Sequence, residues 1–369
     1  MRSFAEFDLL PSLQATLAGQ DLVTPTDIQA RALPALLGGR SLVAVAETGS
    51  GKTLTYVLPI LHRLKRLEDE GQPVETPAQP RAVVLVPTRE LGEQVSKVFK
   101  TFTHETRLRV RSVLGGSSAE IARRNVTGIF EVLVATPGRL VQLLDQGVVS
   151  LSDVRVLVLD EADQLVDLGF LPAAGRIVQL APAKRQLAMF SATIPPAVEA
   201  LIAKSFSEPL VIRSEGSHKT VASLTTVNRE VKDGKRFPVL ESILAEETKG
   251  GTLIFANTRE QCDKVVAELR AAGRECAVYR GEMDKAERRA NLQAFRDGTI
   301  PLLVTTDLGS RGLDVAHVAR VVNYHMPQSL ASYLHRVGRT ARAGRAGVVI
   351  NLVTPRDEGL VKQLRRIRR

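Results

Sequence analysis

Short apolar runs alternate with segments of helical periodicity through most of the chain. Such uninterrupted runs are typical of strands buried on both faces of a parallel sheet. The first half contains predicted strands at 42–46, 82–87, 110–114, 132–135, 156–159 and 187–190. The second half contains them at 252–256, 277–279, 302–305, 318–323 and 348–353. The pattern predicts an α/β fold with two separate, mostly parallel sheets flanked by helices.

The chain has 369 residues, which is longer than one hydrophobic core usually supports, so two domains are expected. Between the two sets of strands, the segment 209–226 mixes Ser, Gly and charged residues as linkers do. We therefore predict an N-terminal domain over 1–208, a linker over 209–226 and a C-terminal domain over 227–369.

Three closely spaced carboxylates, Asp160, Glu161 and Asp163, follow the strand predicted at 156–159. Open α/β sheets hold their ligands beyond the carboxyl ends of the strands. Like charges crowded there repel one another and need a cation, for which Mg²⁺ carried by a nucleotide is the first candidate. The starting hypothesis is a divalent-metal site for a nucleoside triphosphate.

A glycine-rich stretch at 46–53, Ala-Glu-Thr-Gly-Ser-Gly-Lys-Thr, follows the first predicted strand and opens a helix, as a P-loop does. Gly49 and Gly51 let backbone N–H groups approach phosphate oxygens. Lys52 is expected to reach the β- and γ-phosphates, and Thr53 to ligate Mg²⁺. The alternative is a chance glycine-rich turn, which the acidic strand end in the same half of the chain makes less attractive.

Charge and composition limit the partners. The net charge of +10 indicates a polyanionic partner but leaves RNA, DNA and a membrane surface open. Aromatic residues make up only 4%, so base stacking is not expected to dominate recognition. Cys262 and Cys276 have no metal-site or disulfide-framework spacing. With neither a membrane-spanning apolar run nor a signal-peptide start, we expect a cytoplasmic protein.

The motifs resemble those of the DEAD-box ATP-dependent RNA helicases, in family order. The stretches that look like the family's motifs I, II and III are 46–53, 160–163 and 191–193. Those that match its RNA-backbone motifs are 87–91, 115–116 and 136–140, and those that resemble motifs V and VI are 305–314 and 335–342. The resemblance runs from Phe4 to about Thr354 and implies two tandem RecA-like domains with ATP and Mg²⁺ as cofactors.

The stretch 25–29 looks like the family's Q motif, which recognises adenine. An amide donates and accepts at once, so Gln29 could read the adenine edge with two hydrogen bonds. Phe4 stands at the position of the aromatic that stacks on adenine. The alternatives are that Gln29 lies on a solvated helix face and that Phe4 is a core residue. Asp21 and Asp27 occupy positions where the family usually has Gly and Pro.

The resemblance assigns three roles around the nucleotide. The residues that would bind ATP are Phe4, Gln29, Ala46, Glu47, Thr48, Gly49, Ser50, Gly51, Lys52, Thr53 and Asp314, with Thr53 and Asp160 on Mg²⁺. The catalytic set is Lys52, Asp160, Glu161, Arg339 and Arg342, with Glu161 orienting or deprotonating the attacking water. The residues that would couple the ATP and RNA sites are Asp163, Ser191, Thr193, His335 and Arg336, with His335 linked to Asp163.

Arg336, Arg339 and Arg342 recur at every third position, near helical spacing, so we expect them to project from neighbouring turns of one surface. On an anonymous helix such a set would be a solvated basic face. In the family, Arg339 and Arg342 correspond to arginine fingers that reach the γ-phosphate, an effect of about 10³–10⁵ in rate.

RNA recognition by this family implies contacts to the sugar–phosphate backbone, independent of sequence. The candidate residues are Thr88, Arg89, Gly116, Thr136, Gly138, Arg139, Arg288 and Thr305. Outside the motif set, each small residue would be an ordinary turn or cap residue. The second half departs from the family at Arg280, where His is common, at Lys285, where Gln is common, and at Gly309–Ser310, where two alanines are common.

The preferred function is RNA-stimulated ATP hydrolysis coupled to local unwinding or remodelling of short RNA duplexes and RNA–protein complexes. A second hypothesis is an ATP-gated RNA clamp or scaffold, which needs the same residues, and a third is a DNA helicase. The partner is RNA and not a membrane, with possible protein partners in ribosome biogenesis or RNA decay, and the chain is expected to act as a monomer.

Overall fold

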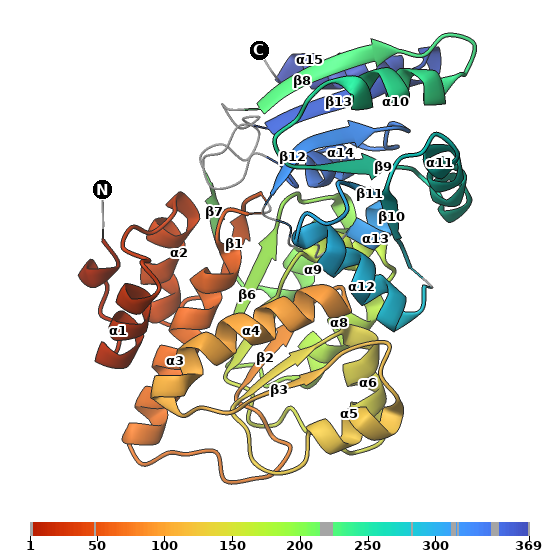
Figure 1. Ribbon diagram of the computed structural model, residues 1–369. Coiled ribbons are helices and arrows are strands. Elements are labelled where there is room, and N and C mark those ends of the chain that lie inside the picture. The colour runs from red at the N-terminus through yellow and green to blue at the C-terminus, as the bar shows by residue number, and fades with distance from the viewer. Residues whose placement is uncertain are drawn as a thin grey trace. The chain divides into compact units, whose positions relative to one another are not determined.

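The computed structural model describes residues 3–47, 49–214, 224–281, 283–310, 315, 317–340 and 347–367. It divides into two compact units, Met1–Ser217 and His218–Arg369, and each unit is built around one parallel sheet. The predicted α/β class with two sheets is therefore confirmed (Figure 1).

Unit 1 is built around a seven-stranded sheet with the order β3-β4-β2-β5-β6-β1-β7. Its strands are β1 (Leu42–Val45), β2 (Ala82–Leu85), β3 (Val110–Val113), β4 (Val132–Ala135), β5 (Val156–Leu159), β6 (Gln186–Ser191) and β7 (Leu210–Arg213). Every neighbouring pair runs parallel, so all carboxyl ends lie at one edge of the sheet. The loops that carry the predicted nucleotide and RNA motifs of this unit leave the sheet at that edge.

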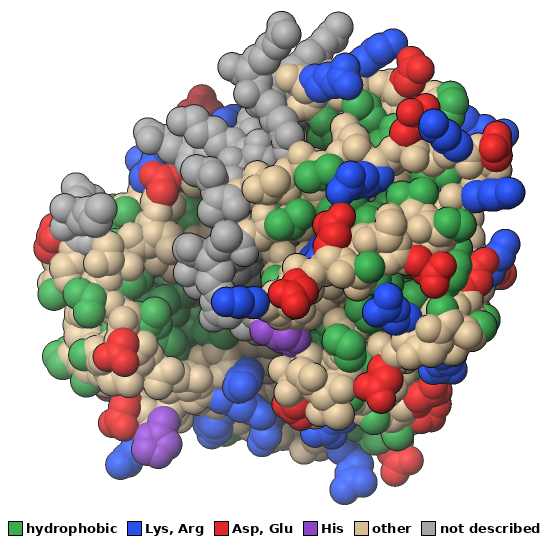
Figure 2. Space-filling model, turned by 45° about the horizontal axis from the view of Figure 1, so that its top comes forward, with side chains coloured by type: hydrophobic (Ala, Val, Ile, Leu, Met, Phe, Trp, Pro, Cys, Tyr) green, Lys and Arg blue, Asp and Glu red, His purple; other side chains and the backbone are tan. Residues whose placement is uncertain are grey.

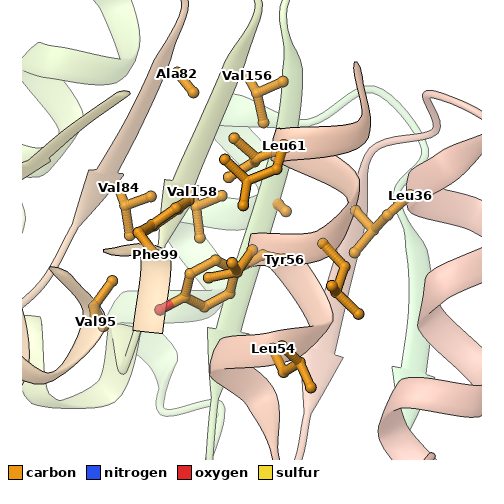
Figure 3. Packing of buried hydrophobic residues seen from close by; sticks show 14 of the residues in the cluster. Leu36, Leu54, Tyr56, Leu61, Ala82, Val84, Val95, Phe99, Val156 and Val158 are labelled. Atoms are coloured by element: carbon orange, nitrogen blue, oxygen red, sulfur yellow. The ribbon is translucent and has the colours of Figure 1, made fainter. Parts of the chain in front are cut away.

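Helices cover both faces of this sheet. They are η1 (Phe4–Glu6), α1 (Pro11–Gly19), α2 (Asp27–Leu37), α3 (Lys52–Asp69), α4 (Arg89–Thr106), α5 (Ala119–Asn125), α6 (Pro137–Asp145), α7 (Ala162–Asp167), α8 (Leu171–Leu180) and α9 (Pro196–Ser205). Residues of η1 and α1–α4 form one core with the sheet, and residues of α5–α9 form the core on the opposite face. Figure 3 shows part of the first core, in which Leu61 and Tyr56 of α3 and Phe99 of α4 meet Val158 of β5.

Unit 2 is built around a six-stranded parallel sheet with the order β10-β11-β9-β12-β13-β8. Its strands are β8 (Leu224–Glu230), β9 (Gly251–Phe255), β10 (Cys276–Tyr279), β11 (Leu302–Thr305), β12 (Val318–Asn323) and β13 (Gly347–Val353). Its helices are α10 (Arg236–Ala245), α11 (Arg259–Ala271), α12 (Lys285–Arg296), α13 (Asp307–Ser310), α14 (Leu330–Val337), η2 (Pro355–Asp357) and α15 (Glu358–Ile367). Two apolar clusters, one on each face, form its core.

Two strands fall in or at the segment 209–226, which the sequence pattern predicts as a linker. β7 pairs with β1 at one edge of the first sheet, and β8 pairs with β13 at one edge of the second. Most residues of both strands are half-buried or exposed, which is why neither gives a clear apolar run. The first sheet therefore extends past position 208, and the two compact units divide between Ser217 and His218.

Within the described ranges, no helix combines the length and apolarity needed to cross a membrane. Cys262 and Cys276 are unbonded thiols buried in one apolar cluster of unit 2. Burial raises the pKa of the Cys262 thiol to about 12, so it stays protonated and packs as a small apolar residue.

Candidate nucleotide and RNA sites

The P-loop joins β1 to α3 and is held by its own lysine. Lys52 is 7% exposed, and its ammonium group donates to the carbonyl oxygens of Ala46 (2.7 Å) and Glu47 (2.9 Å). Gly49 and Gly51 have φ of 86° and 89°, in the left-handed region that favours glycine. The loop therefore presents a buried cation at the N-terminus of an 18-residue helix, an arrangement suited to phosphate.

Gln29 is buried against the P-loop. Its side chain is 4% exposed, its amide nitrogen donates to the Gly51 carbonyl (3.1 Å), and its oxygen accepts the Thr26 N–H (2.8 Å). The Thr26 hydroxyl donates to the Ser50 carbonyl at 2.7 Å. A Cβ added at Gly51 would lie 2.5 Å from the Gln29 amide nitrogen, so the contact requires glycine. The solvated-face alternative for Gln29 is wrong, and its adenine-reading role stays a prediction.

Phe4 lies in the core of unit 1. Its ring is 2% exposed and packs against Phe7 with the ring centroids 6.2 Å apart. The Phe4 N–H donates to the Val23 carbonyl, and the Phe4 carbonyl accepts the Gln14 amide. With so little exposed ring, Phe4 is a core residue here, and stacking on adenine would require η1 to move.

The acidic cluster lies directly after β5, at the carboxyl edge of the sheet. The Asp160 carboxylate is 2% exposed and accepts the Glu161 N–H at 2.9 Å and the Tyr56 hydroxyl at 2.8 Å. Glu161 has φ 48° and ψ 55°, a strained conformation for a residue with a Cβ. Its Oε2 atom is buried and has no hydrogen-bond partner among the described residues. This strained turn holds an unsatisfied carboxylate oxygen beside a second carboxylate.

Burial and, less strongly, the Glu161 carboxylate together raise the pKa of Asp160 to about 6, against the opposing effects of Lys52 and the Tyr56 hydrogen bond. A cation at this point would favour the ionised form of Asp160. No group of three or more His, Cys, Asp or Glu residues within the described ranges could hold a metal. Mg²⁺ usually takes only one or two carboxylates and completes its shell with phosphates and water. Asp160, with Thr53 on α3, therefore fits a nucleotide-borne Mg²⁺.

Tyr56 is a residue of this site that the sequence analysis missed. Its ring packs on Phe190 with the centroids 5.2 Å apart, and Figure 3 shows it among Val84, Phe99 and Val158. Burial raises the pKa of its hydroxyl well above the usual value. An available signal was its place on α3 four residues after Lys52, which puts both on one face of the helix.

We expect Tyr56→Phe to weaken the activation of ATP hydrolysis by Mg²⁺ about 10- to 100-fold, because partners that orient metal ligands commonly have effects of this size. The measurement is ATPase rate against Mg²⁺ concentration. Tyr324→Phe is the matched control, since the Tyr324 hydroxyl bonds Glu268 in unit 2. A Mg²⁺ dependence identical to that of the parent protein would contradict the orienting role.

The predicted coupling residues of unit 1 form one hydrogen-bonded cluster. One carboxylate oxygen of Asp163 accepts the Thr193 N–H (2.9 Å) and hydroxyl (3.0 Å). The Ser191 hydroxyl accepts the Asp163 N–H (3.1 Å) and donates to the Thr193 carbonyl (2.6 Å). The acidic turn after β5 is thereby fixed to the end of β6. The link between Asp163 and His335 stays a prediction.

The predicted RNA motifs of unit 1 meet at the carboxyl ends of β2, β3 and β4. The Gly115 N–H donates to the Thr136 hydroxyl at 2.9 Å, and the Arg89 guanidinium donates to the Gly115 carbonyl at 3.5 Å. Arg139 donates to the Ser117 carbonyl. Three loops that are far apart in the sequence are therefore cross-linked into one surface.

Accessibility differs among these residues. Gly116 and Gly138 are exposed, whereas Thr136 is 5% exposed. The Thr88 hydroxyl accepts the Leu91 N–H and caps α4. Thr136 begins α6 without a side-chain cap. Thr136 therefore fixes the neighbouring loop, while Gly116 and Gly138 lie on the surface near the N-termini of α4 and α6.

Arg336 is buried in unit 2. Its guanidinium donates to Asp307 (2.5 and 2.7 Å), to the side chains of Asn323 (3.0 Å) and Asn257 (2.8 Å), and to the His325 carbonyl (2.6 Å). It also lies over the Phe255 ring, 5.0 Å from the centroid. All five N–H groups of a guanidinium can be accounted for in this set.

The expectation that the three arginines of motif VI share one surface is wrong for Arg336. α14 ends at Val337, and the chain then turns with the Arg339 N–H bonded to the Arg336 carbonyl. Helical spacing does not continue through that turn, so three-residue spacing no longer implies one face. Arg339 is 4% exposed. Arg342, Asp314 and Thr48 lie outside the described residues.

The prediction that Thr305 contacts RNA is also wrong. Its side chain is fully buried, and its hydroxyl donates to the Tyr279 carbonyl at 2.6 Å. It joins β11 to β10 and offers no surface for RNA. The Arg288 guanidinium lies 4.7 Å from the centroid of the Tyr279 ring on the same side of unit 2 and is half-buried. Its RNA contact stays a prediction.

Gly309 explains one departure from the family pattern. A Cβ at this position would lie 2.6 Å from the Tyr279 carbonyl oxygen, 2.9 Å from the Thr305 hydroxyl and 3.0 Å from Arg280 Cα. Backbone atoms cannot swing aside, so the common alanine does not fit here.

We expect Gly309→Ala to destabilise unit 2 by about 1–3 kcal/mol, the usual cost of overpacking. Chemical denaturation monitored by circular dichroism measures it. Gly359→Ala in α15 is the control, because a Cβ there meets no atom within 4 Å. Equal stability of the two variants would rule out the steric explanation.

Two family models match the chain. The model of the DEAD/DEAH box helicases matches residues 26–201, and the model of the helicase conserved C-terminal domain matches residues 235–344. The first covers the P-loop, the acidic cluster and the RNA loops of unit 1. The second covers unit 2 from α10 to α14 and the turn that carries Arg339, and leaves out β8, β13, η2 and α15.

Several proteins resemble this chain over most of its length. RNA helicase CrhR of Synechocystis is 34% identical over 98% of this chain and 72% of its own. DEAD-box ATP-dependent RNA helicase CshA of Geobacillus kaustophilus is 32% identical over 99% and 76%. ATP-dependent RNA helicase DeaD of Mycobacterium tuberculosis is 34% identical, and this chain spans 63% of its length.

A solved structure supports the same assignment. The structure of S. cerevisiae Dbp5 bound to RNA and ADP BeF3 superposes with a TM-score of 0.87 at 29% identity, over 100% of this chain and 94% of that one. Sequence, fold and motif geometry agree, and the chain belongs to the DEAD-box RNA helicase family.

Proposed function

We propose that this chain is an ATP-dependent RNA helicase that couples RNA-stimulated ATP hydrolysis to local, sequence-independent unwinding. One observation supports this most strongly. The acidic turn after β5 and the RNA loops after β2, β3 and β4 occupy one edge of one sheet, and the Asp163–Ser191–Thr193 cluster fixes the acidic turn to β6. Because both sites lie on one sheet edge, a small backbone shift at one site can change the geometry of the other.

For ATP, the proposal assigns phosphate binding to the P-loop. Lys52 exchanges its two carbonyl partners for phosphate oxygens, and the N-terminus of α3 adds its positive dipole. Asp160 and Thr53 would hold the Mg²⁺, which would supply Lewis-acid stabilisation of the phosphates. Glu161, with its unsatisfied Oε2 atom, orients the attacking water. Gln29 has one amide N–H and one lone pair left after its two contacts, which suffices to read adenine.

For RNA, the proposal assigns backbone contacts to Gly116, Gly138, Arg139, Arg89 and the N-termini of α4 and α6. Phosphates favour exposed backbone N–H groups and helix N-termini, and such contacts carry no sequence information. Figure 2 shows acidic and basic side chains interspersed over most of the face drawn, so the net charge of +10 is not gathered into one large basic surface there. Relatives named RNA helicases, and Dbp5 bound to RNA, support RNA over DNA.

For unit 2, the proposal assigns γ-phosphate stabilisation to Arg339 and Arg342. Arg288 is the proposed RNA contact of this unit. Arg336 is a structural residue that holds the segment from which Arg339 emerges.

The test is ATPase activity with RNA, with DNA of the same sequence and without nucleic acid, beside strand separation of a short RNA duplex. We expect RNA to raise kcat and DNA to leave it near the basal rate. ATP should be required for strand separation. RNA-stimulated hydrolysis without strand separation, together with slow RNA release in a non-hydrolysable ATP analogue, would favour the clamp. Equal stimulation by DNA would contradict the RNA assignment.

A further inference from the structure

A row of three asparagines crosses the sheet of unit 2. Asn323 on β12 lies in register with Asn351 on β13, which lies in register with Asn228 on β8. The Asn323 amide donates to the Asn351 carbonyl oxygen, and the Asn351 amide donates to that of Asn228, both at 2.8 Å. Asn323 and Asn351 are fully buried, while Asn228 is exposed at the sheet edge. We call these three residues the asparagine ladder.

The ladder ends on Arg336. The Asn323 side-chain oxygen accepts a hydrogen bond from the Arg336 guanidinium at 3.0 Å. The Asn351 amide nitrogen also donates to the Tyr333 hydroxyl at 3.3 Å. Tyr333 and Arg336 are three residues apart on α14, so the ladder holds one face of that helix at two points. Arg336 in turn holds both carboxylate oxygens of Asp307 at the start of α13.

Packing of the apolar core does not require a polar row at this position. One row back on the same face, Val321 and Val349 are fully buried and apolar. Replacing buried polar groups by apolar ones of similar volume is often neutral or stabilising, and in some proteins buried polar groups serve instead to fix one arrangement. On β12 the polar row is the last residue of the strand, at the carboxyl edge where parallel sheets hold their ligands, while β13 and β8 continue for two more residues.

The segment that carries Arg339 is bonded to Arg336 on one side and to β12 on the other. The Arg339 N–H donates to the Arg336 carbonyl at 3.1 Å, and the Thr340 hydroxyl donates to the Val318 carbonyl at 2.6 Å. The turn that carries Arg339 is therefore clamped between two anchors. One anchor is the residue that the ladder fixes.

We propose that the Asn228–Asn351–Asn323 ladder positions Arg339 for ATP hydrolysis, acting through Arg336. The three asparagines are positioning residues and touch no substrate. The inference rests on the proposed function, because it assumes that Arg339 stabilises the transferred phosphate. It assigns to the exposed edge of β8 an effect on the rate of hydrolysis.

The test variant is Asn351→Leu, which keeps the approximate side-chain shape and removes the three side-chain hydrogen bonds of the central residue, to Asn323, Asn228 and Tyr333. We expect kcat of RNA-stimulated hydrolysis to fall about 10- to 100-fold, the effect of a small misplacement of a catalytic group. KM for ATP should stay within about twofold, because the P-loop is untouched. Val349→Ala is the matched control, since it lies on the same strand and face and bonds to none of the amides. An equal loss of kcat in the control would overturn the proposal.

A double-mutant cycle separates positioning from general damage. In an Arg339→Ala background, Asn351→Leu should cause no further loss of kcat, because the residue it positions is gone. A full additional loss would overturn the proposal. Asn228→Ala truncates the exposed end of the ladder. We expect a smaller loss of kcat from it, and no further loss of kcat in the Arg339→Ala background. An unchanged kcat in this variant would count against the ladder. A parent protein without RNA-stimulated ATPase would instead refute the proposed function.

Discussion

Replacing Glu161 by Gln should abolish ATP turnover while leaving ATP and RNA binding intact. The amide is isosteric, so the strained turn at φ 48° and the Asp160 contact to the residue 161 N–H are kept. The amide has lost the basicity needed to orient or deprotonate water. A positioned general base contributes typically about 10²–10⁴ in rate, and we expect kcat to fall by that factor. Multiple-turnover ATPase assays measure the loss, and filter binding of RNA with ATP measures what remains.

Glu131→Gln is the control for this variant. Glu131 is also a buried carboxylate of unit 1, 5% exposed, and its oxygens accept the Arg109 N–H and guanidinium far from the P-loop. The control should lose stability and keep kcat per folded molecule. If Glu161→Gln retained kcat within about twofold, Glu161 would have no role in the chemistry. If it lost ATP binding as well, its role would be in holding the nucleotide.

The strands and motifs of the core could be predicted from the sequence because their signals are local. Buried parallel strands give apolar runs, and β4, β5, β11 and β12 begin and end where the pattern predicts. The edge strands β7 and β8 could not be predicted this way. Each has one unpaired side and a half-exposed surface, so its polar residues read as a linker.

Side-chain roles were harder to predict where they depend on contacts between distant segments. Nothing in the stretch around Tyr56 shows that its hydroxyl meets Asp160, because the two are 104 positions apart and meet only in the folded sheet. The role of Arg336 also depends on contacts with distant segments. Its spacing from Arg339 suggests a shared surface, but Asn257, Asp307 and Asn323 enclose it from three other segments.

Replacing Arg339 by Ala should lower kcat of RNA-stimulated ATP hydrolysis about 10³- to 10⁵-fold, the range measured for arginine fingers, with a far smaller change in ATP affinity. The charge that the finger stabilises develops in the transition state, so binding of the ground state depends on it little. ATPase rates and equilibrium binding of a fluorescent ATP analogue measure the two quantities separately. Equal losses in both would mean that Arg339 binds nucleotide without acting as a finger.

Arg336→Ala is the comparison that gives this prediction its specificity. The two arginines lie three residues apart, but Arg336 is enclosed by Asp307, Asn323 and Asn257. Removing it leaves a carboxylate and two amides without their cation, which typically costs about 3–5 kcal/mol. We therefore expect Arg336→Ala to lower the midpoint of thermal unfolding of unit 2 clearly more than Arg339→Ala does. If both variants unfolded alike, loss of the fold would explain both losses of activity, and the separation of a structural arginine from a catalytic one would fail.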